Sequence, residues 1–551
     1  MRRFMKPSVR GHLAWACRAT SHAPPLRSLV SLVRHQQLCL PSQNEEEKKT
    51  QRLRGANNIL QIQHFHVTRQ TEIWPIILGA GVAYMGLKFF HNYYEAKEKG
   101  TLKPVKEKKE KKKKKTGPSI EELWGSAEFG KVTGIMGLDT GTMYSRVAVS
   151  FEEGAKVVEN AEGSRGTPSI VGMQGEEFMV GTQAKTLPHL YAPQELIGRR
   201  VDDPGVVAFV EDMGYAPFVN KGIGGTMQLV VGDSGIKTSP ELLTAKLIAH
   251  MGGIASANVE SGACSHAFLA LPLEAAVSPK VHRAMQVAAE QANLTLLGAA
   301  PAPLCSVLGA IVEAGGMDEI GMELPATVVI CDVGRSTDIT VLRVVDASDD
   351  HGLNGLGRLP HAEDDIDIIH STSAPFVGGR KFDQSVIDWL CNEFKKANNL
   401  DLTMDGMTMQ RVEAAALAAR IELSNKLQSE INEPFITADA TGPKHLIASL
   451  SRSQLDRLCR GNVDQVTLAC KNAMRDALES MPAEDLANAY VAVIGGMARM
   501  PALAAAVHET LASNGVTNPT PIELSQPEEV TAIGAGIKGA IRAKGAAGED
   551  Q

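Results

Sequence analysis

Acidic side chains are missing from the start of this 551-residue chain, where no Asp or Glu precedes Glu45. The same stretch contains seven Arg and Lys residues and several serines. A basic leader without acidic residues is typical of a mitochondrial transit peptide, which is removed after import. We therefore expect residues 1–44 to be a presequence, followed by a polar segment over 45–72. A disordered basic tail is the alternative for residues 1–44.

Cysteine pairs are missing too, because none of the eight cysteines belongs to a CxxC motif. Two lie in the expected presequence, and the other six are Cys264, Cys305, Cys331, Cys391, Cys459 and Cys470. This scattered spacing argues against a disulfide framework and against a zinc site. We expect reduced cysteines that behave as small, mostly buried hydrophobic side chains.

Charge is almost absent from residues 73–90, where Lys88 is the single charged side chain. An apolar segment of this length can just cross a bilayer, and Lys88 lies close enough to its end to reach the interface. We expect one transmembrane helix over 73–90; a buried core helix is the alternative.

A polybasic segment follows over residues 91–117, and its stretch from Lys103 to Lys115 is dominated by lysine. Such a composition cannot bury a core and repels itself into an extended linker. A contact with anionic lipid and a plain solvated spacer both agree with it. The positive-inside rule places this linker and the following domain on the matrix side of the mitochondrial inner membrane, and a stop-transfer import route would reverse that orientation.

The net charge of −7 conceals two oppositely charged parts. Residues 1–117 carry 24 basic and 8 acidic side chains, which leaves 32 basic and 55 acidic side chains, a net −23, for residues 118–551. An acidic domain repels phosphate backbones, so we expect no nucleic-acid binding. Partner proteins with basic faces, in a membrane-associated assembly, fit this charge better.

Four glycine-rich turns recur along the acidic part of the chain: Gly137–Thr142, Asp332–Gly334, Val377–Gly379 and Gly495–Pro501. Glycine turns expose consecutive backbone N–H groups to an anion. The aspartates of the first two turns, Asp139 and Asp332, can hold Mg²⁺ through water. The turns therefore predict a cleft that grips a nucleotide.

Hydrophobic periodicity indicates mixed α/β structure around these turns. Apolar residues alternate over Gly134–Val149 and Ala326–Val345, which predicts two related strand pairs. Helical periodicity predicts helices over Pro240–Met251, Ser278–Ala292, Phe382–Ala397 and Met409–Lys426.

With Val158–Gly163, Thr167–Ser169 and Phe435–His445, the ordered turns closely resemble the ATPase domain of the 70-kilodalton heat-shock chaperones, in its bacterial and mitochondrial form. The resemblance covers about residues 130 to 542. It implies an actin-like, two-lobed α/β ATPase fold, which we assign to residues 118–551. Those chaperones continue into a peptide-binding β-sandwich and a helical lid, and we expect no substrate-binding domain in this sequence.

The resemblance also implies ATP or ADP with Mg²⁺ as the cofactor, and Asp139 and Asp332 as the residues that hold Mg²⁺ through water. The positions that match the family's nucleotide-binding residues are Asp139, Gly141, Thr142, Asp332, Gly334, Thr337, Asp338, Gly378, Gly379, Arg420, Ser424, Gly495, Gly496, Arg499 and Glu528.

Several positions depart from the family pattern. Gln194 stands where the family has a lysine that holds the γ-phosphate and the attacking water, and Ala302 stands where it has a glutamate that positions Mg²⁺ and water. A neutral amide cannot offset the charge that develops during phosphoryl transfer, so we assign no catalytic residue and expect impaired or absent hydrolysis. Arg335 replaces a glycine of the second turn, and it either grips phosphate or blocks the pocket.

Three functional hypotheses follow. The first is a membrane-anchored, hydrolysis-deficient relative of the chaperone ATPase domain that serves as an interaction or assembly subunit in mitochondria. The second is an active ATP-dependent chaperone or import-motor ATPase. The third is a purely structural membrane tether whose function lies in residues 73–115.

Overall fold

The computed structural model of the protein describes residues 134–548, except for 152, 216–218, 223–225, 232–235, 261, 350, 352, 354–355 and 363. The presequence, the polar segment, the transmembrane helix and the polybasic linker predicted above lie outside these residues. Among the described residues, no helix has the length and apolar character needed to span a bilayer.

The first lobe is built on a six-stranded mixed sheet in the order β12-β11-β1-β2-β3, with β4 pairing with β2. Its central strand β1 runs antiparallel to β2 and parallel to β11. The strands are β1 (Ile135–Thr140), β2 (Tyr144–Phe151), β3 (Gly154–Val157), β4 (Thr167–Pro168), β11 (His266–Leu271) and β12 (Thr295–Pro301). The apolar residues of β1 pack into a buried core with helices on one side of this sheet.

Short strands and helices complete the first lobe. Ser239 accepts a hydrogen bond from the backbone N–H of Leu242, and with Pro240 at the first helical position this fixes the start of α7. Two small sheets have the orders β6-β5-β7 and β10-β9-β8. The remaining elements are β5 (Ile170–Gln174), β6 (Glu177–Val180), η1 (Gly181–Thr186), β7 (His189–Tyr191), η2 (Pro193–Glu195), α6 (Pro204–Asp212), β8 (Val219–Lys221), β9 (Met227–Val230), β10 (Lys237–Thr238), α7 (Pro240–Ala257), α8 (Leu273–Ala276) and α9 (Pro279–Gln291).

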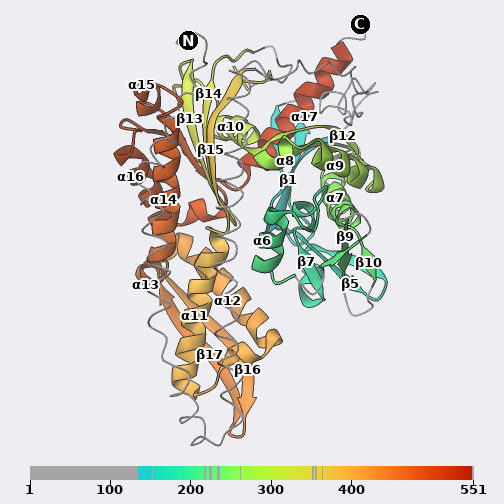
Figure 1. The fold of residues 1–551 in the computed structure, drawn as a ribbon, viewed down its shortest axis with the longest axis vertical. Helices are drawn as coiled ribbons and strands as arrows, with labels where there is room; N and C mark the ends of the chain where they lie inside the picture. Colours follow the sequence, from blue (N-terminus) through green and yellow to red (C-terminus); the bar gives the residue numbers. More distant parts are fainter. Residues whose placement is uncertain are drawn as a thin grey trace, which may run out of the picture. The chain divides into compact units, whose positions relative to one another are not determined.

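The second lobe repeats the plan of the first, with a five-stranded sheet in the order β15-β14-β13-β18-β19. Its strands β13, β14 and β15 are labelled in Figure 1. Its strand β13 runs antiparallel to β14 and parallel to β18, as β1 does to β2 and β11. The strands are β13 (Ala326–Val333), β14 (Thr337–Val344), β15 (Ile366–Ala374), β18 (Tyr490–Ile494) and β19 (Thr520–Pro521). Asp139 and Asp332 therefore occupy equivalent places in the two lobes, at the ends of β1 and β13.

The hairpin of β16 (Gln428–Asp439) and β17 (Gly442–Ser451) packs with α11 and α12, away from the five-stranded sheet of the second lobe (Figure 1). Asp405 accepts a hydrogen bond from the backbone N–H of Met407 and so caps α12. The remaining elements of this lobe are α11 (Gly379–Asn398), η5 (Leu402–Met404), α12 (Gly406–Asn425), α13 (Arg452–Leu458), α14 (Arg460–Ala477), α15 (Ala483–Ala487), η6 (Gly496–Arg499) and α16 (Pro501–Ser513).

Two helices, α10 (Ala302–Glu313) and α17 (Val530–Gly548), cross in backbone contact between the sheets. A Cβ atom added at Gly309 would lie 1.8 Å from the carbonyl oxygen of Val530, and one added at Gly534 would lie 1.8 Å from that of Cys305. Glycine is required at both positions because any side chain would push the helices apart. The apolar residues around this crossing form a buried cluster that includes residues of both sheets.

The secondary structure predicted from periodicity is confirmed. Both predicted strand pairs are present as β1–β2 and β13–β14, and the four predicted helices correspond to α7, α9, α11 and α12. The six cysteines of the described region are free thiols, and all but Cys391 are buried.

Gly534→Ala should lower the free energy of unfolding by about 3 kcal/mol, because the added methyl group has no room between the crossing helices. Urea unfolding of the full-length protein measures this change. Gly461→Ala in α14 is a matched control, since nothing lies within 4 Å of the added Cβ, and it should raise stability by up to about 1 kcal/mol. Equal losses in both variants would contradict the role of the helix crossing.

Candidate functional site

Two carboxylates, one from each lobe, lie at the centre of the candidate site. Desolvation raises the pKa of Asp139 to about 6, although the positive charge of Arg146 opposes this. Desolvation also raises the pKa of Asp332 to about 7, and the negative charges of Asp338 and Asp139 add to the effect. The two aspartates therefore share one poorly hydrated region, where a bound cation would stabilise them.

Three of the four glycine turns converge on Asp332. The backbone N–H of Gly379 donates to the carbonyl oxygen of Gly334 at 2.8 Å, which joins the second turn to the third. A Cβ atom at Gly378 would lie 2.4 Å from that same oxygen. Gly495, with φ of +84°, brings the fourth turn so close that a Cβ there would lie 2.6 Å from Asp332 Oδ1. Gly496 follows it at the start of η6.

The hydroxyl groups of the second turn already have partners. Thr337 Oγ1 donates to the carbonyl oxygen of Val377 at 2.6 Å, and Ser336 Oγ donates to Asp338 Oδ2 at 2.6 Å. Thr337 and Asp338 thus hold the turn together and keep their places beside Asp332, directly across the β13–β14 pair.

Gln194 lies beneath the first turn. Its Nε2 donates to the carbonyl oxygens of Thr140 at 3.0 Å and Gly141 at 3.1 Å, while its Oε1 is buried without a hydrogen-bond partner among the described residues. The next residue, Glu195, accepts a hydrogen bond from the hydroxyl of Thr142 at 2.9 Å. A carboxylate at this turn disfavours a phosphate nearby, and the sequence reasoning overlooked it.

Ala302, at the other substituted position, is the first residue of α10. Its carbonyl oxygen accepts a hydrogen bond from Ser306 Oγ at 2.8 Å. Its methyl side chain can neither bind Mg²⁺ nor orient water, so this position contributes no polar side-chain group to the cleft.

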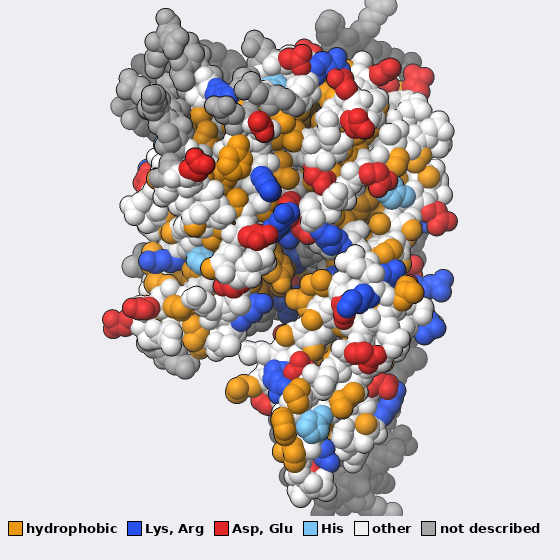
Figure 2. All heavy atoms as spheres, turned by 180° about the vertical axis from the view of Figure 1, so that it is seen from behind, with side chains coloured by type: hydrophobic (Ala, Val, Ile, Leu, Met, Phe, Trp, Pro, Cys, Tyr) orange, Lys and Arg blue, Asp and Glu red, His pale blue; other side chains and the backbone are white. Residues whose placement is uncertain are grey.

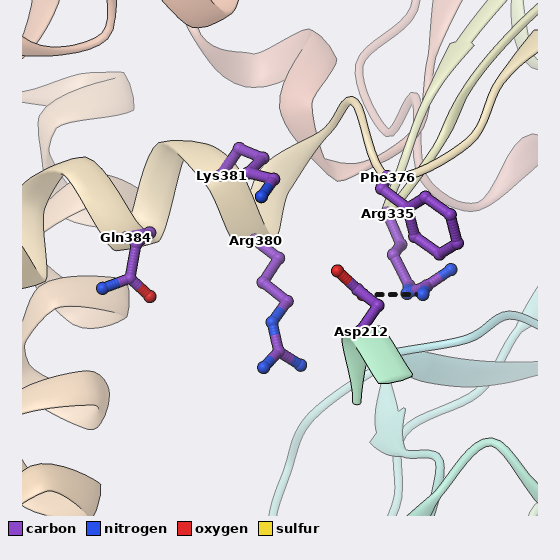
Figure 3. Close-up of a pocket in the computed structure, with 6 residues that line it drawn as sticks. All are labelled: Asp212, Arg335, Phe376, Arg380, Lys381 and Gln384. Atoms are coloured by element: carbon purple, nitrogen blue, oxygen red, sulfur yellow. Dashed lines mark hydrogen bonds and ion pairs between the residues drawn. The ribbon is translucent and has the colours of Figure 1, made fainter. Parts of the chain in front are cut away.

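Arg335 of the second lobe forms an ion pair with Asp212 of the first lobe, and we call this pair the clasp. Its Nη2 donates to Asp212 Oδ2 of α6 at 2.8 Å, and its guanidinium carbon lies 4.8 Å from the ring centres of both Phe209 and Phe376. Figure 3 shows the Arg335 guanidinium pointing at Asp212, in a pocket also lined by Arg380 and other polar residues. The guanidinium is therefore held by a carboxylate and two aromatic rings.

Four of the predicted nucleotide-binding residues, Arg420, Ser424, Arg499 and Glu528, fall into two groups. Arg499 donates to both carboxylate oxygens of Glu528, at 2.8–2.9 Å, so two residues predicted separately are directly joined. Arg420, on α12, pairs with Asp383. The carbonyl oxygen of Ser424, on the same helix, accepts a hydrogen bond from Arg452. No hydrogen bond or ion pair of the described residues joins the α12 group with Arg499.

The site fits a magnesium nucleotide on its own residues. Asp139 and Asp332 provide the hard oxygen atoms that Mg²⁺ prefers, and nothing lies within 4 Å of a Cβ added at Gly496, so the fourth turn has room for a phosphate oxygen. Within the described stretches of the chain, no group of three or more His, Cys, Asp or Glu side chains could hold a metal alone. Water and phosphate oxygens would therefore complete the coordination, and the role of each predicted nucleotide-binding residue stays a prediction.

Comparisons with known proteins agree with this interpretation of the fold. The family model described as Hsp70 protein matches residues 135–349 and 362–550. The chaperone protein DnaK of Psychrobacter cryohalolentis is 32% identical over 415 residues, which are 74% of this chain and 58% of DnaK. The chain thus spans little more than half the length of this curated relative.

The raised pKa values predict that the nucleotide-free protein becomes less stable as pH rises from 5 to 7. In this window native Asp139 and Asp332 still bind protons that the unfolded chain has lost, so the free energy of unfolding falls with pH. Asp332→Asn should flatten this slope by up to about 1.4 kcal/mol per pH unit in urea unfolding without Mg²⁺. Asp318→Asn, which changes an exposed carboxylate, should leave the slope as it is. An unchanged slope in Asp332→Asn would refute the prediction.

Breaking the clasp should destabilise the domain. Asp212→Asn keeps the shape of the side chain but removes the charge that pairs with Arg335, whose side chain is only 10% exposed. We expect a loss of about 1–3 kcal/mol in the free energy of unfolding, measured by urea titration. Asp202→Asn, in an exposed pair with Arg200, is the control and should cost less than about 1 kcal/mol. Similar small changes in both would show that the clasp is no stronger than a surface pair.

Proposed function

This chain belongs to the Hsp70 family, and from that premise we propose that its two-lobed domain holds ATP or ADP with weak or no hydrolysis. It is a DnaK-like chaperone ATPase domain by family. In our proposal it works as an interaction or assembly subunit, with the bound nucleotide as a structural ligand.

The observation that carries this proposal is the hydrogen bonding of the Gln194 side chain. Both protons of its side-chain amide are used by backbone carbonyl oxygens of the first turn, so the residue braces the turn and offers no charge to a phosphate. Enzymes accelerate phosphoryl transfer mainly by electrostatic stabilisation of the charge that develops on the phosphate oxygens. A neutral side chain that is already hydrogen-bonded supplies no such stabilisation, so the chemical step should be slow.

Ala302 and Glu195 also argue against rapid hydrolysis. Ala302 has no carboxylate to order the attacking water, and Glu195 adds a negative charge beside Thr142. Both features disfavour the transition state, where negative charge must be neutralised and water must be held in line. Neither change removes the glycine turns that would hold the nucleotide itself.

Retention of nucleotide is supported by groups that close the cleft. The Arg335–Asp212 pair links the second turn of one lobe to α6 of the other. A ligand that contacts both lobes adds to this closure by mass action, in proportion to the logarithm of its concentration over its dissociation constant. A domain held closed in this way would present one fixed surface to protein partners.

The proposed location and partners rest on the sequence. The acid-free leader over 1–44 and the apolar segment over 73–90 support a single-pass protein of the mitochondrial inner membrane, with its domain facing the matrix. The net charge of −23 over 118–551 supports partners with basic surfaces and argues against nucleic acid. Acidic and basic side chains intermingle on the face seen in Figure 2, so a partner would meet both signs of charge there.

A second candidate is an active ATPase that serves protein folding or import. It is favoured by Asp139 and Asp332, which remain in equivalent places at the ends of β1 and β13. This candidate requires another group to supply the charge that Gln194 lacks.

The test is Mg·ATP binding by calorimetry and single-turnover hydrolysis with the full-length protein. We expect binding without measurable turnover. The double variant Gln194→Lys/Ala302→Glu restores a cation and a carboxylate and should raise the hydrolysis rate at least about tenfold. Gln183→Lys, which adds the same charge at an exposed site of the same lobe, is the control and should not change the rate.

Each outcome decides between the hypotheses. Turnover by the unchanged protein that disappears in Asp332→Asn would establish the active ATPase. Absence of ATP and ADP binding would refute the nucleotide-holding function and favour the structural tether. Binding with a rate that the double variant does not raise would show that position 194 is not the limiting defect.

A further inference from the structure

Arg146 brings a positive charge to the first phosphate turn from a position that the family resemblance did not highlight. It lies on β2 directly opposite Asp139 of β1 in the antiparallel register. Residues directly opposite each other in such a pair project from the same face of the sheet. A Cβ atom added at Gly166 would lie 3.5 Å from Arg146 Nη2, which locates the guanidinium beside the chain that leads into β4.

The guanidinium of Arg146 has no hydrogen-bond or ion-pair partner among the described residues, although three carboxylates lie nearby. Its Nε is buried without a hydrogen bond. Three other arginines around the cleft each form an ion pair with a carboxylate: Arg165 with Glu529, Arg335 with Asp212 and Arg499 with Glu528. An unpaired, partly buried cation is costly, so its site is suited to an anion that arrives from outside.

The charge of Arg146 reaches carboxylates from both lobes. It opposes the desolvation that raises the pKa of Asp139 and of Asp332, and it also acts on the pKa of Glu529 just before α17. This agrees with the geometry, in which Arg146 lies opposite Asp139 in the β1–β2 pair and its guanidinium lies beside Gly166.

We propose that Arg146 binds the phosphate chain of a nucleoside diphosphate or triphosphate in this cleft. The inference rests on the proposed function, because it requires that the cleft binds nucleotide. Two parallel N–H groups of a guanidinium match two phosphate oxygens, and such charge-assisted pairs are among the strongest hydrogen bonds in proteins. Arg146 thereby supplies affinity from β2, while position 194 beneath the first turn stays neutral.

The test compares ADP and adenosine binding to the full-length protein and three variants, by calorimetry with adenosine as a competitor. Arg146→Gln should weaken ADP binding at least about tenfold and change adenosine binding by less than about twofold, because only the phosphate contact is lost. Arg146→Lys keeps the charge but loses the bidentate contact, so it should weaken ADP binding less than Arg146→Gln does and leave adenosine binding unchanged. Arg165→Gln removes a nearby arginine that is bound to Glu529, and it should change ADP affinity less than about threefold.

The outcomes separate this inference from the proposed function. If the unchanged protein binds ADP and Arg146→Gln binds it equally well, the inference fails and the nucleotide-holding function stands. Equal weakening of ADP and adenosine in Arg146→Gln would also overturn it, because the residue would then only shape the cleft. If the unchanged protein binds neither ADP nor ATP, both proposals fail together.

Discussion

The constraint on which the site depends is the meeting of two desolvated carboxylates, Asp139 and Asp332, from two lobes of similar plan. Each lies at the end of the central strand of its sheet, so the duplication itself brings them toward each other. Burial disfavours the charged form of both carboxylates, and for Asp332 the negative charges of Asp338 and Asp139 add to this effect, which is why both pKa values rise toward neutrality. Protons, a metal ion or nearby cationic side chains would each stabilise this pair of carboxylates. Arg146 on β2 and the proposed Mg²⁺ site both bring positive charge to these two carboxylates.

Much of the fold could be predicted from the sequence because it depends on local rules. Strand pairs around Asp139 and Asp332 follow from alternating apolar residues, and helices such as α7 follow from periodicity with a Ser-Pro start at Ser239. The two-lobed arrangement came from the resemblance and not from periodicity. The backbone contact between α10 and α17 was not predicted, because Gly309 and Gly534 are far apart in the sequence and an isolated glycine in a helix does not reveal its partner.

The chemistry of the cleft could be predicted only where a motif carried it. The glycine turns and their aspartates were found, and three of these turns do converge on Asp332. The choice between phosphate binding and exclusion at Arg335 needed the structure, since its partner Asp212 lies on the other lobe. Arg146 and Glu195 were overlooked because they are ordinary residues beside a motif. Their significance depends on contacts that only the structure shows. Arg146 lies opposite Asp139 in the β1–β2 pair, and Glu195 accepts a hydrogen bond from the hydroxyl of Thr142.

Binding and hydrolysis place different demands on the charges of such a cleft, and this difference explains how it can keep one and lose the other. A cation that contacts the phosphate chain equally before and during reaction lowers the energy of both states and therefore raises affinity alone. A cation at position 194 would instead face the γ-phosphate and the attacking water, where charge changes during transfer. If the cleft binds nucleotide as we propose, Arg146 on β2 stabilises the bound state, while the hydrogen-bonded amide of Gln194 adds no positive charge at the reacting atoms. The proposed nucleotide binding is therefore compatible with the proposed loss of hydrolysis.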